Sequence, residues 1–131
     1  MPKRLLTPPT LNRSTYSHAA AVEGGTLIVT AGQVAFDVDG KVVGAGDITA
    51  QTHQVYRNLR EALKAAGADF GDVIKVTTYV TEPAHLAAAR DIRMTYFTAP
   101  EQPASTGLVV SRLAHPDLLI EVEAMAFVER R

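Results

Sequence analysis

The last apolar stretch of the chain, residues 118–127, constrains the fold more than any other segment. Side chains alternate between the two faces of a strand, so Glu121 and Glu123 point the same way, roughly 6–7 Å apart. The residues at 120, 122, 124 and 126 form an apolar stripe on the opposite face. A strand that packs on one face and carries two carboxylates on the other predicts a use for the second face: solvent, a subunit interface or a site.

Composition places the chain in a narrow class. With 131 residues, of which 47% are hydrophobic, it is predicted to form a single domain over residues 1–131. A net charge of −1 gives no electrostatic basis for binding nucleic acid. No apolar run reaches the roughly 18 residues that span a bilayer, and the basic start has no hydrophobic region behind it that would make a secretory signal. Without cysteine, disulfides and thiol catalysis are excluded. We expect a cytoplasmic protein that binds neither nucleic acid nor membrane.

The hydrophobic pattern predicts an α+β fold of order β-β-β-α-β-α-β-β. Asp39-Gly40 is a pair favoured in hairpin turns, Asp47 is a good helix N-cap and Gly67 a good helix stop. Because β-α-β crossovers join parallel strands, the sheet should be mixed, with both helices on one face. The predicted strands are 26–31, 34–38, 41–43, 73–80, 108–112 and 118–127, and the predicted helices are 48–66 and about 81–97.

The helix-free face of this sheet should be partly apolar. Met125 and Phe127 beside the two glutamates would make a patch too apolar for open solvent, which favours an oligomer. The residues expected on this face are Lys75, Thr77, Tyr79, Leu119, Glu121, Glu123, Met125 and Phe127.

Several motifs together resemble those of the Rid/YjgF proteins, the reactive intermediate deaminases, over nearly the whole chain. The resemblance rests on residues 29–33, 47–51, 58–59, 65–68, 72–77, 103–106, 111–113 and 120–124. It implies a chorismate-mutase-like fold and a homotrimer with three clefts between subunits. The activity it implies is hydrolysis of enamines and imines, such as 2-aminoacrylate, to ketoacids and ammonia, without metal or organic cofactor. Older labels in the family are translation inhibitor and endoribonuclease.

The resemblance also implies site residues. Glu121 matches the family's glutamate that orients the attacking water, and a partly buried carboxylate suits that role. Like-charge repulsion from Glu123 should raise the proton affinity of Glu121. Tyr16 matches a tyrosine that lines the pocket, and Gly32 matches a glycine where a ligand comes close to the backbone. A half-buried aromatic and a turn glycine are the structural alternatives for these two.

One departure from the family pattern concerns substrate binding. Deaminating members carry an arginine just after the Pro-Ala pair, whose guanidinium forms a bidentate ion pair with the substrate carboxylate. Here Ser105 takes that position, and Gly107 replaces a cysteine that is common two residues later. Arg90 falls where many members have a pocket asparagine, and Arg93 lies three residues on, along the same helical face. Either guanidinium could compensate for the missing one, but arginines on an exposed helix face are usually solvated or salt-bridged.

Two interpretations follow. The first is a cofactor-independent hydrolase of enamines and imines whose activity on carboxylate substrates is altered or weakened by Ser105. The second is a non-catalytic trimeric module that binds a small carbonyl or carboxylate metabolite, or a protein partner. No metal site is predicted, because His18, His53, His85 and His115 are scattered without metal-ligand spacing.

Overall fold

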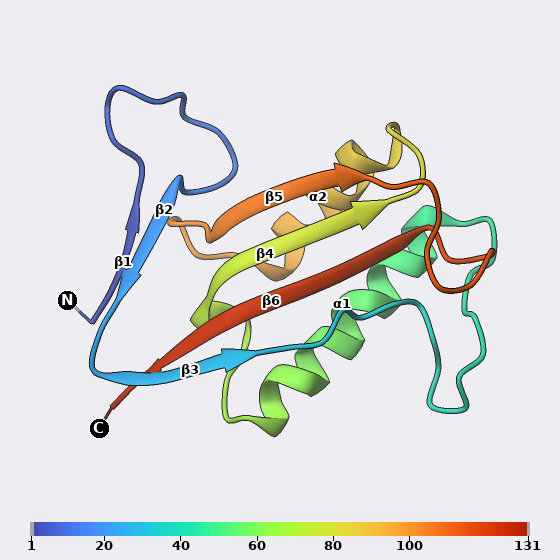
Figure 1. Cartoon of the computed structure of the whole chain (residues 1–131), viewed down its shortest axis with the longest axis horizontal. Coiled ribbons are helices and arrows are strands. Elements are labelled where there is room, and N and C mark those ends of the chain that lie inside the picture. Colours follow the sequence, from blue (N-terminus) through green and yellow to red (C-terminus); the bar gives the residue numbers. More distant parts are fainter. Residues whose placement is uncertain (1, 131) are drawn as a thin grey trace.

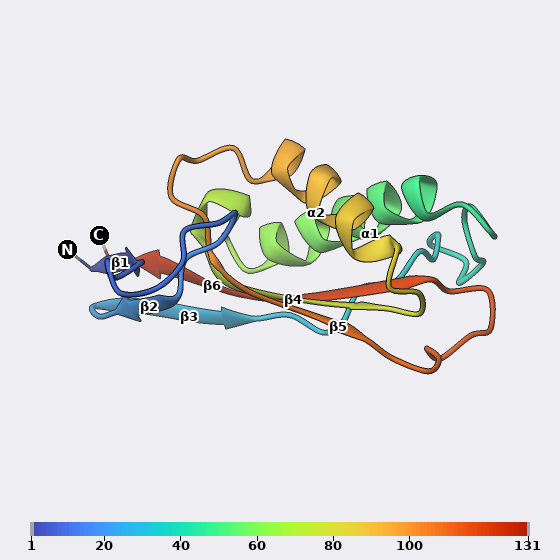
Figure 2. The same cartoon turned by 90° about the horizontal axis from the view of Figure 1, so that it is seen from above.

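The structure is a computed structural model that describes residues 2–130. It consists of a four-stranded sheet in the order β3-β6-β4-β5, two helices that cover one face of the sheet, and a separate two-stranded ribbon of β1 and β2 (Figures 1 and 2). Only β4 and β5 are parallel within the larger sheet, so the predicted mixed α+β architecture is confirmed. The elements are β1 (Lys3–Leu6), β2 (Ala19–Val22), β3 (Gly25–Val29), α1 (Ile48–Ala65), the 3₁₀ turn η1 (Phe70–Asp72), β4 (Val73–Val80), α2 (His85–Tyr96), β5 (Ala104–Val109) and β6 (Ile120–Glu129).

Helix α1 forms where its caps predict. The Asp47 side chain accepts a hydrogen bond from the backbone nitrogen of Ala50 at 3.1 Å, which satisfies one of the free donors of the first turn. Gly67 has φ 83°, a left-handed conformation that glycine adopts without strain, and the helix stops before it. The buried face of α1 includes Val55 and Leu59, which pack against the apolar stripe of β6. Within residues 2–130, neither helix is both long and apolar enough to cross a membrane.

The strands predicted at 34–38 and 41–43 do not form, although the chain does turn at Asp39-Gly40. This segment contains a single isolated bridge, between Phe36 and Val42. The Asp37 carboxylate accepts from the backbone nitrogens of Asp39 and Lys41, both at 2.9 Å. The backbone nitrogens of Asp37 and Val43 donate to the carbonyls of Lys41 and Ala35, at 2.9 and 2.8 Å, so the turn is closed without regular strand pairing. The first two strands of the chain are instead 3–6 and 19–22, in a region where the sequence predicted no strand.

Strand β5 begins four residues earlier than predicted and ends at Val109. Its sequence, ASTGLV, has weak strand propensity, but β4 beside it is a long run of β-branched residues. Parallel pairing with β4 brings Ser105 opposite Val76 and Gly107 opposite Thr78. The partner strand therefore decides where β5 starts, and both predicted site positions lie inside a regular strand.

The alternation of β6 is confirmed. Ile120, Val122 and Ala124 are buried in the core beneath the helices, whereas the two glutamates lie on the open face. Phe127 lies on the expected face, opposite Leu27 of β3, but its side chain is only 5% exposed. A Cβ on Gly25 would come within 2.5 Å of the Phe127 ring, so the ring occupies the space that a side chain at position 25 would fill. The exposed apolar side chains of the open face are Leu27, Val29, Leu108 and Met125.

Candidate functional site

The predicted site residues fall into two groups on opposite faces of the sheet. Ser105 pairs with Val76, whose side chain is fully buried beneath the helices. Glu121 pairs with Tyr79, three residues further along β4, and therefore lies on the other face. A single chain thus forms an open-face group around Glu121 and a helix-side group around Ser105, and the sheet separates them.

The open-face group consists of Glu121 and Gly32. The two backbone hydrogen bonds between Gln33 and Val122, at 2.8 and 3.0 Å, hold the segment after β3 against β6. A Cβ on Gly32 would lie 2.7 Å from the carboxyl carbon of Glu121, closer than any real contact of that kind. The Glu121 carboxylate therefore occupies the space that a side chain at position 32 would fill, which brings the two predicted residues together.

Two effects raise the pKa of Glu121. Burial is the larger, and the negative charge of Glu123 is the second. Glu123 itself accepts a hydrogen bond of 2.6 Å from the Tyr79 hydroxyl, which raises the pKa of Tyr79. Among residues 2–130, no hydrogen-bond donor lowers the pKa of Glu121. Glu121 is thus a proton acceptor whose neighbour is fixed in place and whose own oxygens are free, an arrangement that suits a general base.

The helix-side group lines a pocket of about 440 Å³ between residues 14–16, helix α2 and strand β5. The pocket brings together four predicted residues from distant parts of the chain, namely Tyr16, Arg90, Ser105 and Gly107. Its size lies within the usual range of small-molecule sites. The long irregular segment between β1 and β2 therefore contributes one wall of the pocket.

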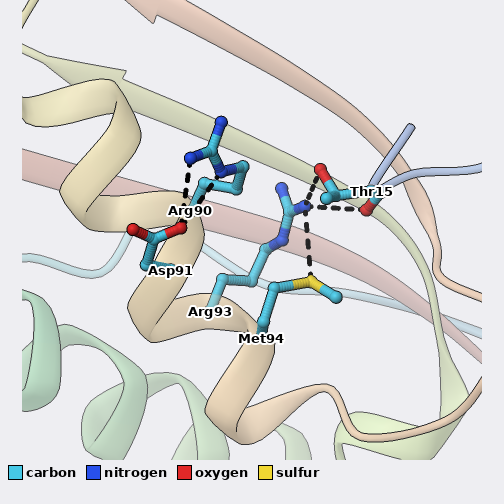
Figure 3. A network of polar contacts seen from close by, with 5 residues as sticks. All are labelled: Thr15, Arg90, Asp91, Arg93 and Met94. Carbon is cyan, nitrogen blue, oxygen red and sulfur yellow. Dashed lines mark hydrogen bonds and ion pairs between the residues drawn. The ribbon is translucent and has the colours of Figure 1, made fainter.

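Arg93 is the central polar residue of this pocket. Only 6% of its surface is exposed. One terminal nitrogen, Nη1, donates to the Ser105 hydroxyl at 2.8 Å. The other donates to the Thr15 carbonyl at 2.9 Å and the Thr15 hydroxyl at 3.3 Å (Figure 3). Its Nε is buried without a partner among the described residues. Burial lowers the pKa of Arg93, and the nearby guanidinium of Arg90 lowers it further.

The two arginines of α2 differ in surroundings. Arg90 is half-exposed and its guanidinium donates to Asp91 at 3.1 Å (Figure 3). The expectation that these arginines are solvated or salt-bridged therefore holds for Arg90 and is wrong for Arg93. Within residues 2–130 the ion pairs join Arg60 with Asp69 and Arg90 with Asp91, so Arg93 has no carboxylate partner in this part of the chain.

An aromatic cluster supports the α2 side of the pocket. Tyr56 on α1 is 1% exposed and stacks on Tyr96 of α2, with ring centroids 5.1 Å apart. The Tyr96 hydroxyl and the His53 Nδ1 lie 2.7 Å apart, within hydrogen-bond distance. These contacts hold α2 against α1 and so fix the position of Arg93. The periodicity of α1 places Tyr56 beside Val55 at the buried face, so its burial could be predicted from the sequence. Its stacking on Tyr96 could not, because Tyr96 belongs to a different helix.

Comparison with known proteins supports one family. The Endoribonuclease L-PSP family profile matches residues 9–128. A RutC family protein of Pyrococcus horikoshii is 38% identical over 112 residues, which cover 86% of this chain and 87% of that protein. The crystal structure of YyfB, a Rid family protein of unknown function from Yersinia pestis, has a TM-score of 0.90 and 39% identity and covers 98% of this chain and 100% of its own. RidA from an Antarctic Psychrobacter has a TM-score of 0.73 and 25% identity, covering 90% and 92%.

Proposed function

We propose that this chain, which belongs to the Endoribonuclease L-PSP family, also called the Rid or YjgF family, is an enzyme. The proposed reaction is the hydrolysis of reactive enamines and imines to a carbonyl compound and ammonia, without a cofactor. The observation that carries the proposal is the Glu121 carboxylate, which lies against Gly32, has a raised pKa and accepts no hydrogen bond from a side chain of residues 2–130. The likeness to a RidA structure supports the same chemistry.

In the proposed reaction, an enamine first tautomerises to its imine. Glu121 accepts a proton from a bound water as the water oxygen attacks the imine carbon, and the imine nitrogen gains a proton from solvent to give a carbinolamine. Glu121 then returns its proton to the amino nitrogen. The carbon–nitrogen bond breaks, ammonia leaves, and loss of the hydroxyl proton gives the carbonyl product.

The two groups of site residues are proposed to meet between chains. The sheet separates Glu121 from Ser105 within one chain, so a ligand that contacts both needs a second copy. The exposed Leu27, Val29 and Met125 on the open face support burial of that face in a homotrimer. Light scattering of the purified protein should give three times the chain mass, and a monomer at micromolar concentration would contradict the assembly.

Ser105 is proposed to alter the substrate preference. A serine hydroxyl cannot form the bidentate ion pair that an arginine at this position would form, so β5 contributes no cation to the pocket. Preference among carboxylate substrates should therefore differ from that of relatives with an arginine after the Pro-Ala pair.

The test uses imines generated in solution by an amino acid oxidase, with semicarbazide as a trap for the imine that remains. Wild-type protein should reduce the trapped fraction, and Glu121→Gln should remove roughly 10²–10⁴-fold of that acceleration, because a neutral amide cannot accept the proton. Circular dichroism and light scattering of the variant serve as controls for folding and assembly. A variant as active as wild type would exclude Glu121 as the base.

The second candidate is a binding module without catalysis, and Ser105 is the observation that favours it. This candidate takes the lead if wild-type protein binds 2-oxo acids but leaves the lifetime of every imine tested at the spontaneous value.

A further inference from the structure

We infer that Arg93 and Ser105 together bind the carboxylate of a small aliphatic 2-oxo or 2-imino acid in the helix-side pocket. The identity of the reacting end of this ligand rests on the proposed function, whereas the carboxylate site rests on the pocket itself. The site differs from an arginine on β5, because the cation comes from α2 and a neutral hydroxyl completes it.

The first argument is the unpaired charge. Arg93 as a residue is 6% exposed, so its guanidinium has lost most of its water, and a buried charge is normally balanced by a counter-ion. The described chain offers Arg93 a backbone carbonyl, two hydroxyls and a weak contact with the Met94 sulfur, but no carboxylate. An anion from outside the chain would supply the missing charge.

The second argument is the donor geometry. The Ser105 oxygen accepts a hydrogen bond from Arg93 Nη1 at 2.8 Å, which leaves the hydroxyl hydrogen free to donate. Nη1 carries a second hydrogen, and no acceptor among residues 2–130 takes it. Two free donors therefore lie side by side at the pocket wall, one for each oxygen of a carboxylate.

The third argument is the rest of the wall, which selects the kind of anion. Pro83, Leu86 and Ala87 contribute apolar surface to the same pocket of about 440 Å³. An aliphatic chain attached to the carboxylate would cover this surface, and a free phosphate would leave it exposed. Arg90, at the rim, adds positive potential that favours entry of an anion, although its guanidinium is engaged with Asp91.

The experiment measures binding without turnover. Titration calorimetry with 2-oxohexanoate and with its neutral counterpart 2-hexanone isolates the carboxylate, because the two molecules differ only in that group. Wild-type protein should bind the acid at least about tenfold more tightly than the ketone, since hydrogen bonds to charged groups contribute that much. Arg93→Met should abolish the difference, and Ser105→Ala should reduce it by about threefold to tenfold.

The matched control is Arg57→Met, which removes an exposed guanidinium from α1 outside the pocket and should leave binding unchanged. Arg93→Lys covers the case in which Arg93→Met fails to fold: it keeps the charge but lacks the planar fork, and should weaken binding of the acid several-fold. The inference is overturned if folded Arg93 variants bind the acid as wild type does, if Arg90→Met rather than Arg93→Met removes the preference, or if inorganic phosphate competes more strongly than 2-oxohexanoate.

These outcomes separate the inference from the proposed function. Acid binding that depends on Arg93, in a protein that hydrolyses no imine, would refute the hydrolase and keep the carboxylate site. Imine hydrolysis that depends on Glu121, together with acid binding that does not depend on Arg93, would keep the hydrolase and refute the carboxylate site.

Discussion

Each face of the sheet holds one ionisable side chain whose charged form is disfavoured by its surroundings, and the surroundings differ between the two faces. On the open face, Glu121 lies against a glycine and beside a second carboxylate, so its pKa is raised. On the helix side, Arg93 is buried without a counter-ion among residues 2–130, and burial lowers its pKa. The acid keeps free oxygens at an accessible face, which suits proton transfer to and from water. The cation is fixed by neutral oxygens, which suits anchoring an anion.

The largest expected effect on kcat/KM comes from substituting alanine for the site glycines, Gly32 on the open face and Gly107 on the helix side. Gly32→Ala puts a methyl group where the Glu121 carboxylate lies, so the carboxylate must move. We expect a loss of at least about 100-fold in kcat/KM for imine hydrolysis, because displacing a catalytic group by about 1 Å can cost that much. Gly107→Ala should have a smaller effect, within about tenfold and mainly on KM, since its methyl meets only the end of the Leu86 side chain, at 3.1 Å.

Gly71→Ala is the control, because a Cβ there meets nothing within 4 Å and the position has no left-handed backbone. Steady-state kinetics on one imine compare all three variants. Equal losses for Gly32→Ala and Gly107→Ala would show that the two faces do not divide the work as described.

The second prediction concerns variants in which the guanidinium of the pocket is placed on β5, at position 105, instead of on α2, at position 93. Ser105→Arg alone should give less than about a threefold gain on acidic imines, because the new guanidinium meets Arg93 and like charges repel. Combined with Arg93→Met, the same substitution should raise kcat/KM for acidic imines by about tenfold or more over Arg93→Met alone. Neutral imines serve as the control and should not respond. A large gain from Ser105→Arg in the presence of Arg93 would mean that Arg93 does not occupy the anion site.

The third prediction concerns pH. A general base works only when deprotonated, so activity should fall as the pH drops through the raised pKa of Glu121. Glu123→Gln removes the like charge, lowers that pKa and should shift the acidic limb of the kcat/KM profile to lower pH, by about one unit or less. Burial is the larger cause and remains, so the limb should stay above that of an exposed glutamate. An unchanged limb would contradict coupling between the two carboxylates.

The smallest expected effect is on stability. A carboxyl group whose pKa is raised by folding stabilises the folded state only at low pH, and this contribution is lost as the pH rises through the folded pKa. Glu121→Gln should therefore raise Tm at neutral pH, and the gain should disappear below about pH 4. Glu129→Gln, on the exposed end of β6, is the matched control and should show no such gain. Calorimetric melting at several pH values gives both results.

The sequence by itself determined what depends on local periodicity. Residues 73–80 and the alternation of β6 specify β4 and the face of Glu121, because side chains in a strand alternate strictly. Asp47 and Gly67 specify the ends of α1, because capping is a property of a few neighbouring atoms. The pairing of Glu121 with Glu123 follows from the same periodicity.

Only the tertiary structure decided the features that depend on contacts between distant segments. Pairing with β4 starts β5 at Ala104, and the turn at Asp39-Gly40 forms with one isolated bridge in place of two paired strands. The role of Arg93 depends on Thr15, 78 residues away, and on Ser105 of β5. Helical spacing places Arg90 and Arg93 on one face but cannot tell which guanidinium is buried, because burial is decided by what packs against the helix.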